Sequence, residues 1–70
     1  MKKLGVVKSI NEGKLVLKTE KLVKIGAKIY DEEGAFVGTV IDYFGPTMGP
    51  YLLISPKKAP EPFYGKDLYG

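Results

Sequence analysis

Short apolar runs alternate with turn residues along the whole chain. Valine, isoleucine, leucine, tyrosine and phenylalanine are concentrated in these runs, and glycine or proline interrupts the chain too often for a long helix. Short runs bounded by turn residues are typical of a small all-β domain. The pattern predicts strands at residues 4–10, 14–18, 28–30, 36–44, 51–55 and 63–69.

The first two predicted strands form a hairpin around residues 11–13, where Gly13 is free to adopt a positive φ. Apolar and polar residues alternate in these strands, so that one face packs in a core and the other largely faces water. We expect the core face to carry Leu4, Val6, Ile10, Leu15 and Leu17. The opposite face of the second strand carries Lys14, Val16 and Lys18.

The remaining segments connect the predicted strands. Residues 19–25 are compatible with a loop or with one turn of helix, residues 31–34 form a turn, and residues 56–62 make an extended crossing. Gly38, inside the longest predicted strand, permits a bulge or a tight bend. Six short strands are too little sheet for a sandwich, whereas closure removes exposed sheet edges. We therefore expect a single domain over residues 1–70, a small closed β-barrel.

The composition excludes several classes of enzyme. The chain has 70 residues, no cysteine and no histidine, which excludes thiol nucleophiles, serine–histidine triads and structural zinc sites. A chain of this length buries only about 60% of its unfolded surface, so a partner surface would help to stabilise it. The formal net charge is +3, and all 11 basic residues are lysines. Because nucleic-acid readers usually depend on arginine, this charge is weak evidence for an RNA partner.

The chain shows no targeting or membrane-spanning segment. Lys8 ends the first apolar stretch too early for a signal peptide. The longest uncharged run, residues 43–56, contains glycine and proline and is shorter than the roughly 18 apolar residues that a spanning helix needs. We expect a soluble, cytoplasmic protein.

An acidic triplet at residues 31–33 raises the hypothesis of a metal or acid–base site. Divalent metal sites need ligands that converge from more than one segment, whereas Asp31 can bond its own backbone and Gly34 can close an ordinary turn. We favour the turn. Catalysis would otherwise rest on Asp42, Glu20, a lysine or a tyrosine, and these form no recognised nucleophile–base spacing. The sequence therefore predicts a protein that is not an enzyme and binds no metal or cofactor.

Lysines make the N-terminal half of the chain basic. They could contact phosphate groups, or they could protect edge strands from aggregation. We favour the second role, because stacking aromatic residues are not interleaved with the lysines along the sequence. The lysines concerned are Lys2, Lys3, Lys8, Lys14, Lys18, Lys21, Lys24 and Lys28.

The segment from residue 44 to residue 51 combines two glycines and two prolines with Phe44, Met48 and Tyr51. Large apolar side chains on a stiff surface loop indicate a protein-binding patch whose ordering entropy is already reduced. The alternative is that Phe44 and Tyr51 fold inward and the loop only caps the barrel. The residues alone leave both interpretations open.

At this segment the chain resembles the archaeal-type Gar proteins (the glycine–arginine-rich family) of the H/ACA ribonucleoprotein that makes pseudouridine in RNA. The specific part of the resemblance is the central run: valine–glycine, then aspartate, phenylalanine–glycine–proline and proline–tyrosine at their observed spacings. Weaker similarity extends over nearly the whole chain. It covers residues 3–7, 36–46, 50–54, 56–57 and 64–69. The glycine–arginine tails of the eukaryotic relatives and the lysine-rich extension of some archaeal relatives are absent.

The resemblance implies a six-stranded barrel of the kind found in translation-factor and reductase domains. It also implies a non-catalytic subunit that binds the catalytic domain of a dyskerin-type pseudouridine synthase and meets guide RNA only indirectly, in the cytoplasm of an archaeal-type cell. There the protein would engage the mobile thumb loop of the synthase and aid substrate loading and product turnover. By position, the partner-binding residues would be Phe44, Gly45, Pro46, Pro50 and Tyr51. Gly38 and Asp42 would shape the strand that leads to them.

Two alternatives remain. Residues 30–42 also resemble the hairpin of photosynthetic-reaction-centre-type (PRC) barrels, which occur in ribosome-maturation binding modules. This hairpin discriminates poorly, and the segment from Gly45 to Tyr51 favours the Gar family. The second alternative is a barrel that binds RNA directly through its lysines.

Overall fold

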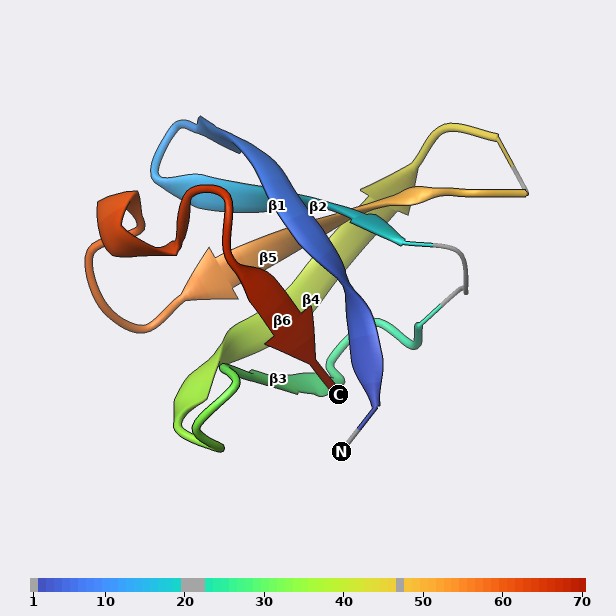
Figure 1. Ribbon diagram of the computed structural model, residues 1–70. Helices are drawn as coiled ribbons and strands as arrows, with labels where there is room; N and C mark the ends of the chain where they lie inside the picture. Colours follow the sequence, from blue (N-terminus) through green and yellow to red (C-terminus); the bar gives the residue numbers. More distant parts are fainter. Residues whose placement is uncertain (1, 20–22, 47) are drawn as a thin grey trace.

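Six antiparallel strands form a closed barrel in the order β1-β2-β5-β4-β3-β6 (Figure 1). The computed structural model describes residues 2–19, 23–46 and 48–70. The strands are β1 (Lys3–Asn11), β2 (Lys14–Thr19), β3 (Lys28–Tyr30), β4 (Phe36–Phe44), β5 (Tyr51–Pro56) and β6 (Asp67–Tyr69). The expected fold class is confirmed. Of the segment 19–25 expected as loop or helix, Thr19 ends β2, and residues 20–22 lie outside the described residues.

The hairpin between β1 and β2 closes with a two-residue turn. Both of its residues, Glu12 and Gly13, have positive φ, at 53° and 77°. Positive φ at both central positions matches the type I′ turn, whose twist suits a hairpin. The turn was predicted, but only Gly13 was expected in this backbone region.

The core-facing side of β1 differs from the prediction. Val7 is buried in the core with 1% of its surface exposed, whereas Val6 is only half-buried and stays outside the core cluster. The register of β1 shifts between Val7 and Ser9 opposite β2, and between Lys3 and Gly5 opposite β6. Such irregularities break the strict alternation of faces, so the prediction of Val6 was wrong.

The core is a single cluster of buried aliphatic side chains contributed by all six strands. Leu4 and Ile10 pack against it from the rim, as expected. On the outer side of β2, Val16 is only 8% exposed, although that side was expected to face water. The core cluster consists of Val7, Leu15, Leu17, Ile29, Val37, Val40, Leu52, Ile54 and Leu68.

Gly38 lies where three strands approach closely. It pairs with Ile29 of β3 and with Pro56 of β5. A Cβ atom at this position would lie 2.1 Å from the carbonyl oxygen of Ser55. The absence of a side chain therefore permits the close approach of β4 to β5, and the register of the β3–β4 pair shifts beside this position.

The C-terminal segment is less extended than predicted. A 3₁₀ helix, η1, covers Glu61–Phe63, and the last strand is confined to Asp67–Tyr69. Phe63 donates its backbone N–H to the carbonyl of Pro60, at 3.0 Å. The prolines preset the φ angles of such a turn and remove donors that a strand would need, which the expected extended crossing overlooked. Among the described residues, no helix is long and apolar enough to cross a membrane.

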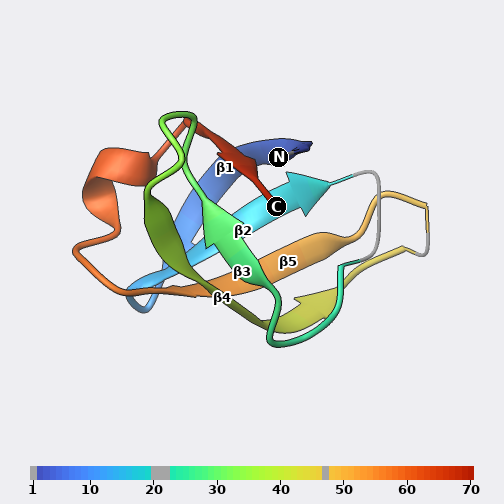
Figure 2. The same cartoon turned by 90° about the horizontal axis from the view of Figure 1, so that it is seen from below.

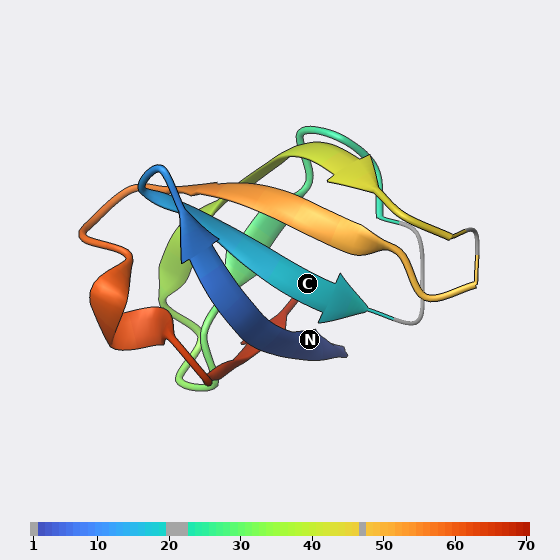
Figure 3. The same cartoon turned by 90° about the horizontal axis from the view of Figure 1, so that it is seen from above.

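The unequal lengths of the strands leave part of the β4–β5 hairpin unpaired on one side and make the β3–β6 pairing very short. β3 pairs only with the first part of β4, between Phe36 and Thr39, so the far half of β4 pairs with β5 alone. The β4–β5 hairpin consequently projects from the barrel, as Figures 2 and 3 show. The barrel closes between β3 and β6 through one residue pair, Tyr30 and Tyr69.

Candidate functional site

Two aromatic rings stack on the outer face of the projecting hairpin. Phe44, the last residue of β4, pairs with Tyr51, the first residue of β5. Their ring centroids lie 5.6 Å apart and their planes are 18° from parallel. Half of the surface of Phe44 is exposed, and Tyr51 is partly exposed. The alternative in which both rings fold inward is therefore not what the structure shows.

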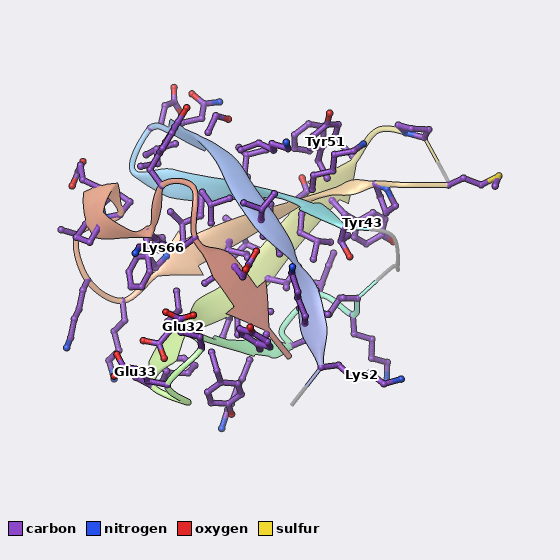
Figure 4. The ribbon with its side chains drawn as sticks, in the orientation of Figure 1. Lys2, Glu32, Glu33, Tyr43, Tyr51 and Lys66 are labelled. Carbon is purple, nitrogen blue, oxygen red and sulfur yellow. The ribbon has the colours of Figure 1, made fainter. Side chains whose placement is uncertain are left out.

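Further exposed apolar side chains lie at this end of the hairpin, on both of its faces. Tyr43 faces the side opposite to the stacked rings and is 42% exposed, although its partner Leu52 is fully buried. Figure 4 shows Tyr43 and Tyr51 at the same end of the molecule. Met48 in the connecting loop is 92% exposed. We call the following residues the hairpin patch: Ile41, Tyr43, Phe44, Pro46, Met48 and Tyr51.

The loop between the two strands has a defined backbone. Gly45 and Gly49 adopt φ values of 96° and 101°, a region that L side chains rarely enter. Pro50 is buried, and its carbonyl accepts a hydrogen bond of 3.1 Å from the backbone N–H of Thr19 at the end of β2. The loop is thus anchored to the barrel at its C-terminal end. Thr47 lies outside the described residues.

The structure divides the predicted partner-binding residues into two groups. Phe44, Gly45 and Pro46 are exposed and Tyr51 is partly exposed, so that these four can meet a partner. Pro50 is buried and offers no surface, and it holds the loop in place instead. Sequence reasoning had no means of telling which of the two prolines turns inward.

The two residues expected to support the patch both lie on β4. Gly38 sits at the close approach to β5 described above. The carboxylate oxygen Oδ1 of Asp42 accepts a hydrogen bond of 2.8 Å from the backbone N–H of Tyr43. This bond lies directly after a register shift between Val40 and Asp42. A side chain that satisfies the backbone beside a bulge helps to fix the direction of the strand end.

Lys18 adjoins the stacked rings, a contact that the sequence analysis missed. Its Nζ atom lies 4.8 Å from the centroid of the Tyr51 ring, a cation–π distance. Lys18 pairs with Tyr51 across β2 and β5 and with Val6 across β2 and β1. Lysine and aromatic residues that are not interleaved along the sequence thus meet across neighbouring strands. Only the strand register would have revealed it.

On its other side, Lys18 borders a shallow hollow of about 550 Å³ over β1, β2 and β6. Three lysines and one carboxylate line it: Lys3, Lys8, Lys18 and Asp67. Lys3 and Asp67 form an exposed ion pair with an N–O distance of 3.5 Å. The remaining lining comes from Leu4, Gly5, Val6 and Thr19. We call this feature the lysine hollow.

The acidic triplet forms the turn that the sequence predicted. Oδ1 of Asp31 accepts hydrogen bonds of 2.9 Å from the backbone N–H groups of Glu33 and Ala35. Gly34 donates its N–H to the carbonyl of Asp31 and has a φ of 85°. Within the described parts of the chain, no group of acidic residues is arranged to hold a metal ion.

Comparison with known proteins gives two matches. The family model described as the Gar1/Naf1 RNA binding region matches residues 1–69. A protein of the archaeon Methanothermobacter thermautotrophicus, whose printed name is "Uncharacterized protein", is 36% identical over 75 residues. That alignment covers 99% of this chain and 82% of the relative.

Proposed function

We propose a function for this chain on one premise: it belongs to the Gar1/Naf1 family. That family is an RNA-binding accessory family associated with the H/ACA ribonucleoprotein, and it is not a catalytic one. We propose that this chain is a non-catalytic protein subunit of that particle. Its hairpin patch binds the catalytic domain of the pseudouridine synthase.

One observation carries the proposal, namely the exposed stack of Phe44 on Tyr51. Rigid aromatic side chains are enriched among the residues that dominate the energy of protein interfaces. The stack holds both rings in place before a partner arrives. Little conformational entropy then remains to be lost on binding.

We propose that the subunit affects RNA modification by shifting the populations of the open and closed states of the synthase's thumb loop. A bound subunit changes the mobile thumb loop of the synthase only if it has a different affinity for the open and closed states of that loop. Preference for the open state would speed substrate loading and product release. No acid, base or metal from this chain is needed, in agreement with a sequence that has neither histidine nor cysteine.

The test is capture of the synthase by hairpin variants of this chain. In the double variant Phe44→Ala with Tyr51→Ala, we expect affinity for the synthase to fall at least about 30-fold, the effect of losing a dominant interface residue. Tyr64→Ala is the matched control, because Tyr64 is also an exposed aromatic residue, at 63%, and lies outside the hairpin. Circular dichroism establishes that each variant keeps its fold.

The second readout is the rate of modification. With the double variant, multiple-turnover pseudouridylation should fall to the rate seen without this subunit, because product release is no longer assisted. If the double variant captured the synthase at wild-type strength, the hairpin patch would not be the surface that binds the synthase. Equal weakening by Tyr64→Ala would lead to the same conclusion.

A further inference from the structure

A second aromatic surface lies outside the hairpin patch, on the side where the barrel closes. Tyr69 pairs with Tyr30 across β6 and β3, and Tyr30 pairs with Phe36 across β3 and β4. The rings of Tyr30 and Phe36 meet edge to face, with centroids 6.0 Å apart. Phe36 is 40% exposed, and both tyrosines are partly exposed. We call Tyr69, Tyr30 and Phe36 the aromatic row.

Lysines flank the aromatic row at both ends. Lys3 pairs with Tyr69 across β1 and β6. At the other end, Nζ of Lys57 lies 5.8 Å from the centroid of the Phe36 ring. The row is therefore a platform of π faces and edges between two cations. A similar composition binds single-stranded nucleic acid, in which bases stack on aromatic rings and cations follow the backbone.

The lysine hollow continues this surface. Lys3 belongs to both features, and beyond it the hollow adds Lys8 and Lys18. Gly5 lies between these lysines and has no side chain, and β1 passes so close to β2 there that a Cβ atom would collide with the carbonyl of Lys18. Asp67 offsets one of the positive charges through its ion pair with Lys3. The hollow keeps an excess of positive charge beside the rings.

The acidic turn that follows Tyr30 faces a different hollow. Asp31, Glu32 and Glu33 line a smaller depression of about 140 Å³ together with Pro62, Phe63, Lys66 and Asp67. Figure 4 shows Glu32, Glu33 and Lys66 on the side of the molecule that carries η1. Oδ1 of Asp31 is in addition engaged by two backbone N–H groups. The three carboxylates of the turn thus line the second depression, and Asp67 is the acidic residue that the two hollows share.

We propose that the aromatic row and the lysine hollow together bind single-stranded RNA. Bases stack on Phe36, Tyr30 and Tyr69, and phosphates lie along Lys3, Lys8 and Lys18. This inference rests on the RNA-binding role of the family and gives that role a surface. It replaces the indirect contact with RNA that the sequence resemblance implied. Because the chain has no arginine for bidentate contacts to base edges, binding should depend little on base sequence.

The test uses a fluorescently labelled oligouridylate and the full chain, with affinity measured by anisotropy across a range of salt concentrations. In Phe36→Leu with Tyr69→Leu, apolar volume remains and stacking is lost. We expect affinity to fall about 5- to 150-fold for each stacked base that is lost, with an unchanged salt slope. In Lys3→Gln with Lys8→Gln, the slope of log K against log salt should become shallower by about 0.7 for each lysine.

Two control variants make the test specific. Lys66→Gln removes a lysine beside the acidic turn, and Phe44→Leu removes a ring from the hairpin patch. Neither should change RNA affinity by more than about twofold, the usual size of effects away from a site. Equal loss in Lys66→Gln would show diffuse attraction to charge and overturn the proposed site. So would wild-type affinity in the Phe36/Tyr69 variant, or absence of RNA binding by the wild-type chain at low salt.

The same variants separate this proposal from the proposed function. The Phe36/Tyr69 variant should capture the synthase at wild-type strength while it loses RNA. The Phe44→Leu variant, which leaves the contact of Lys18 with Tyr51 in place, should bind the oligouridylate normally while its affinity for the synthase falls. Loss of both partners in the Phe36/Tyr69 variant, with the fold retained, would show that the aromatic row belongs to the synthase interface.

Discussion

The two halves of the β4–β5 hairpin carry the same types of apolar residue but differ in how far these residues are buried. In the half near the barrel, Val37, Val40 and Ile54 expose at most 1% of their surface. Leu52, the partner of Tyr43, is also buried, because β2 lies alongside its strand β5. In the projecting half, Tyr43 and Phe44 keep 42% and 50% of their surface in solvent. The difference follows from the length of β3, which covers only the first part of β4. On β4, side chains of the inner face are therefore buried where β3 and Ala27 lie alongside the strand, and exposed beyond them, as at Tyr43.

The largest expected effect is at Leu52, in the core. Leu52→Ala removes a fully buried side chain and leaves a cavity among tightly packed neighbours. We expect a loss of about 2–5 kcal/mol in the free energy of unfolding. For a domain of this size the melting temperature would fall by about 10–40 °C. Thermal and urea unfolding followed by circular dichroism measure the change, and a loss below about 1 kcal/mol would show that Leu52 is not a core residue.

Alanine substitutions of glycine test how well the backbone in each half of the hairpin accepts a Cβ atom. Gly38→Ala places a methyl group against the backbone of Ser55 and Pro56, which cannot yield without moving a strand. We expect the free energy of unfolding to fall by about 1–3 kcal/mol, as it does when a side chain is overpacked in other protein cores. Gly45→Ala, at a φ of 96° in the projecting half, meets the ring and the backbone nitrogen of Tyr51 without a severe clash, and strains one residue at a cost of about 1–2 kcal/mol. Urea midpoints should therefore rank Gly38→Ala as the less stable variant, and the reverse order would show that β4 and β5 can separate at Gly38 to accept a methyl group.

The exposed stack should matter less for stability. Phe44→Ala removes a ring that is half exposed, so it leaves no closed cavity and loses the contact with Tyr51. We expect the free energy of unfolding to fall by about 0.5–1.5 kcal/mol, the range measured for aromatic pairs. Comparison of its urea midpoint with that of Leu52→Ala tests the distinction directly. Equal destabilisation by the two variants would mean that Phe44 is a core residue in solution.

The smallest effect concerns the cation beside the stack. Lys18→Met keeps the aliphatic stem and removes the charge above the Tyr51 ring. At an exposed site this should cost about 0.5–1 kcal/mol. A double-mutant cycle with Tyr51→Leu isolates this energy from unrelated effects of either change. Strictly additive losses in the cycle would show that the cation–π contact contributes nothing.

The sequence predicted the fold well because turn chemistry marks the strand ends. Asp31 to Gly34 and the turn at Gly13 form where glycine and a short polar side chain require them. The prediction failed where two local effects competed. At β1 an irregular register moved Val7 inward in place of Val6. At the C-terminal segment, prolines favoured a 3₁₀ turn over an extended crossing.

The candidate sites were predictable only in part. Glycine and proline identified the loop after Phe44 as a stiff surface segment, since their backbone preferences are local. The burial of Pro50 and the contact of Lys18 with Tyr51 depend on which strands become neighbours. The aromatic row is the clearest case, because Tyr30 and Tyr69 are far apart in sequence and meet only across the closing strands.

That closing pair has a consequence for how the barrel opens. Between β3 and β6 only Tyr30 and Tyr69 are paired, so this joint is the weakest place in the wall, and amide hydrogens beside it should exchange with solvent before those of β2 and β5. A ligand that contacts the rings of both Tyr30 and Tyr69 would hold β3 and β6 together. Because such a ligand would bind only the closed barrel, it would slow hydrogen exchange there and would raise the melting temperature further with each increase in its free concentration above its dissociation constant.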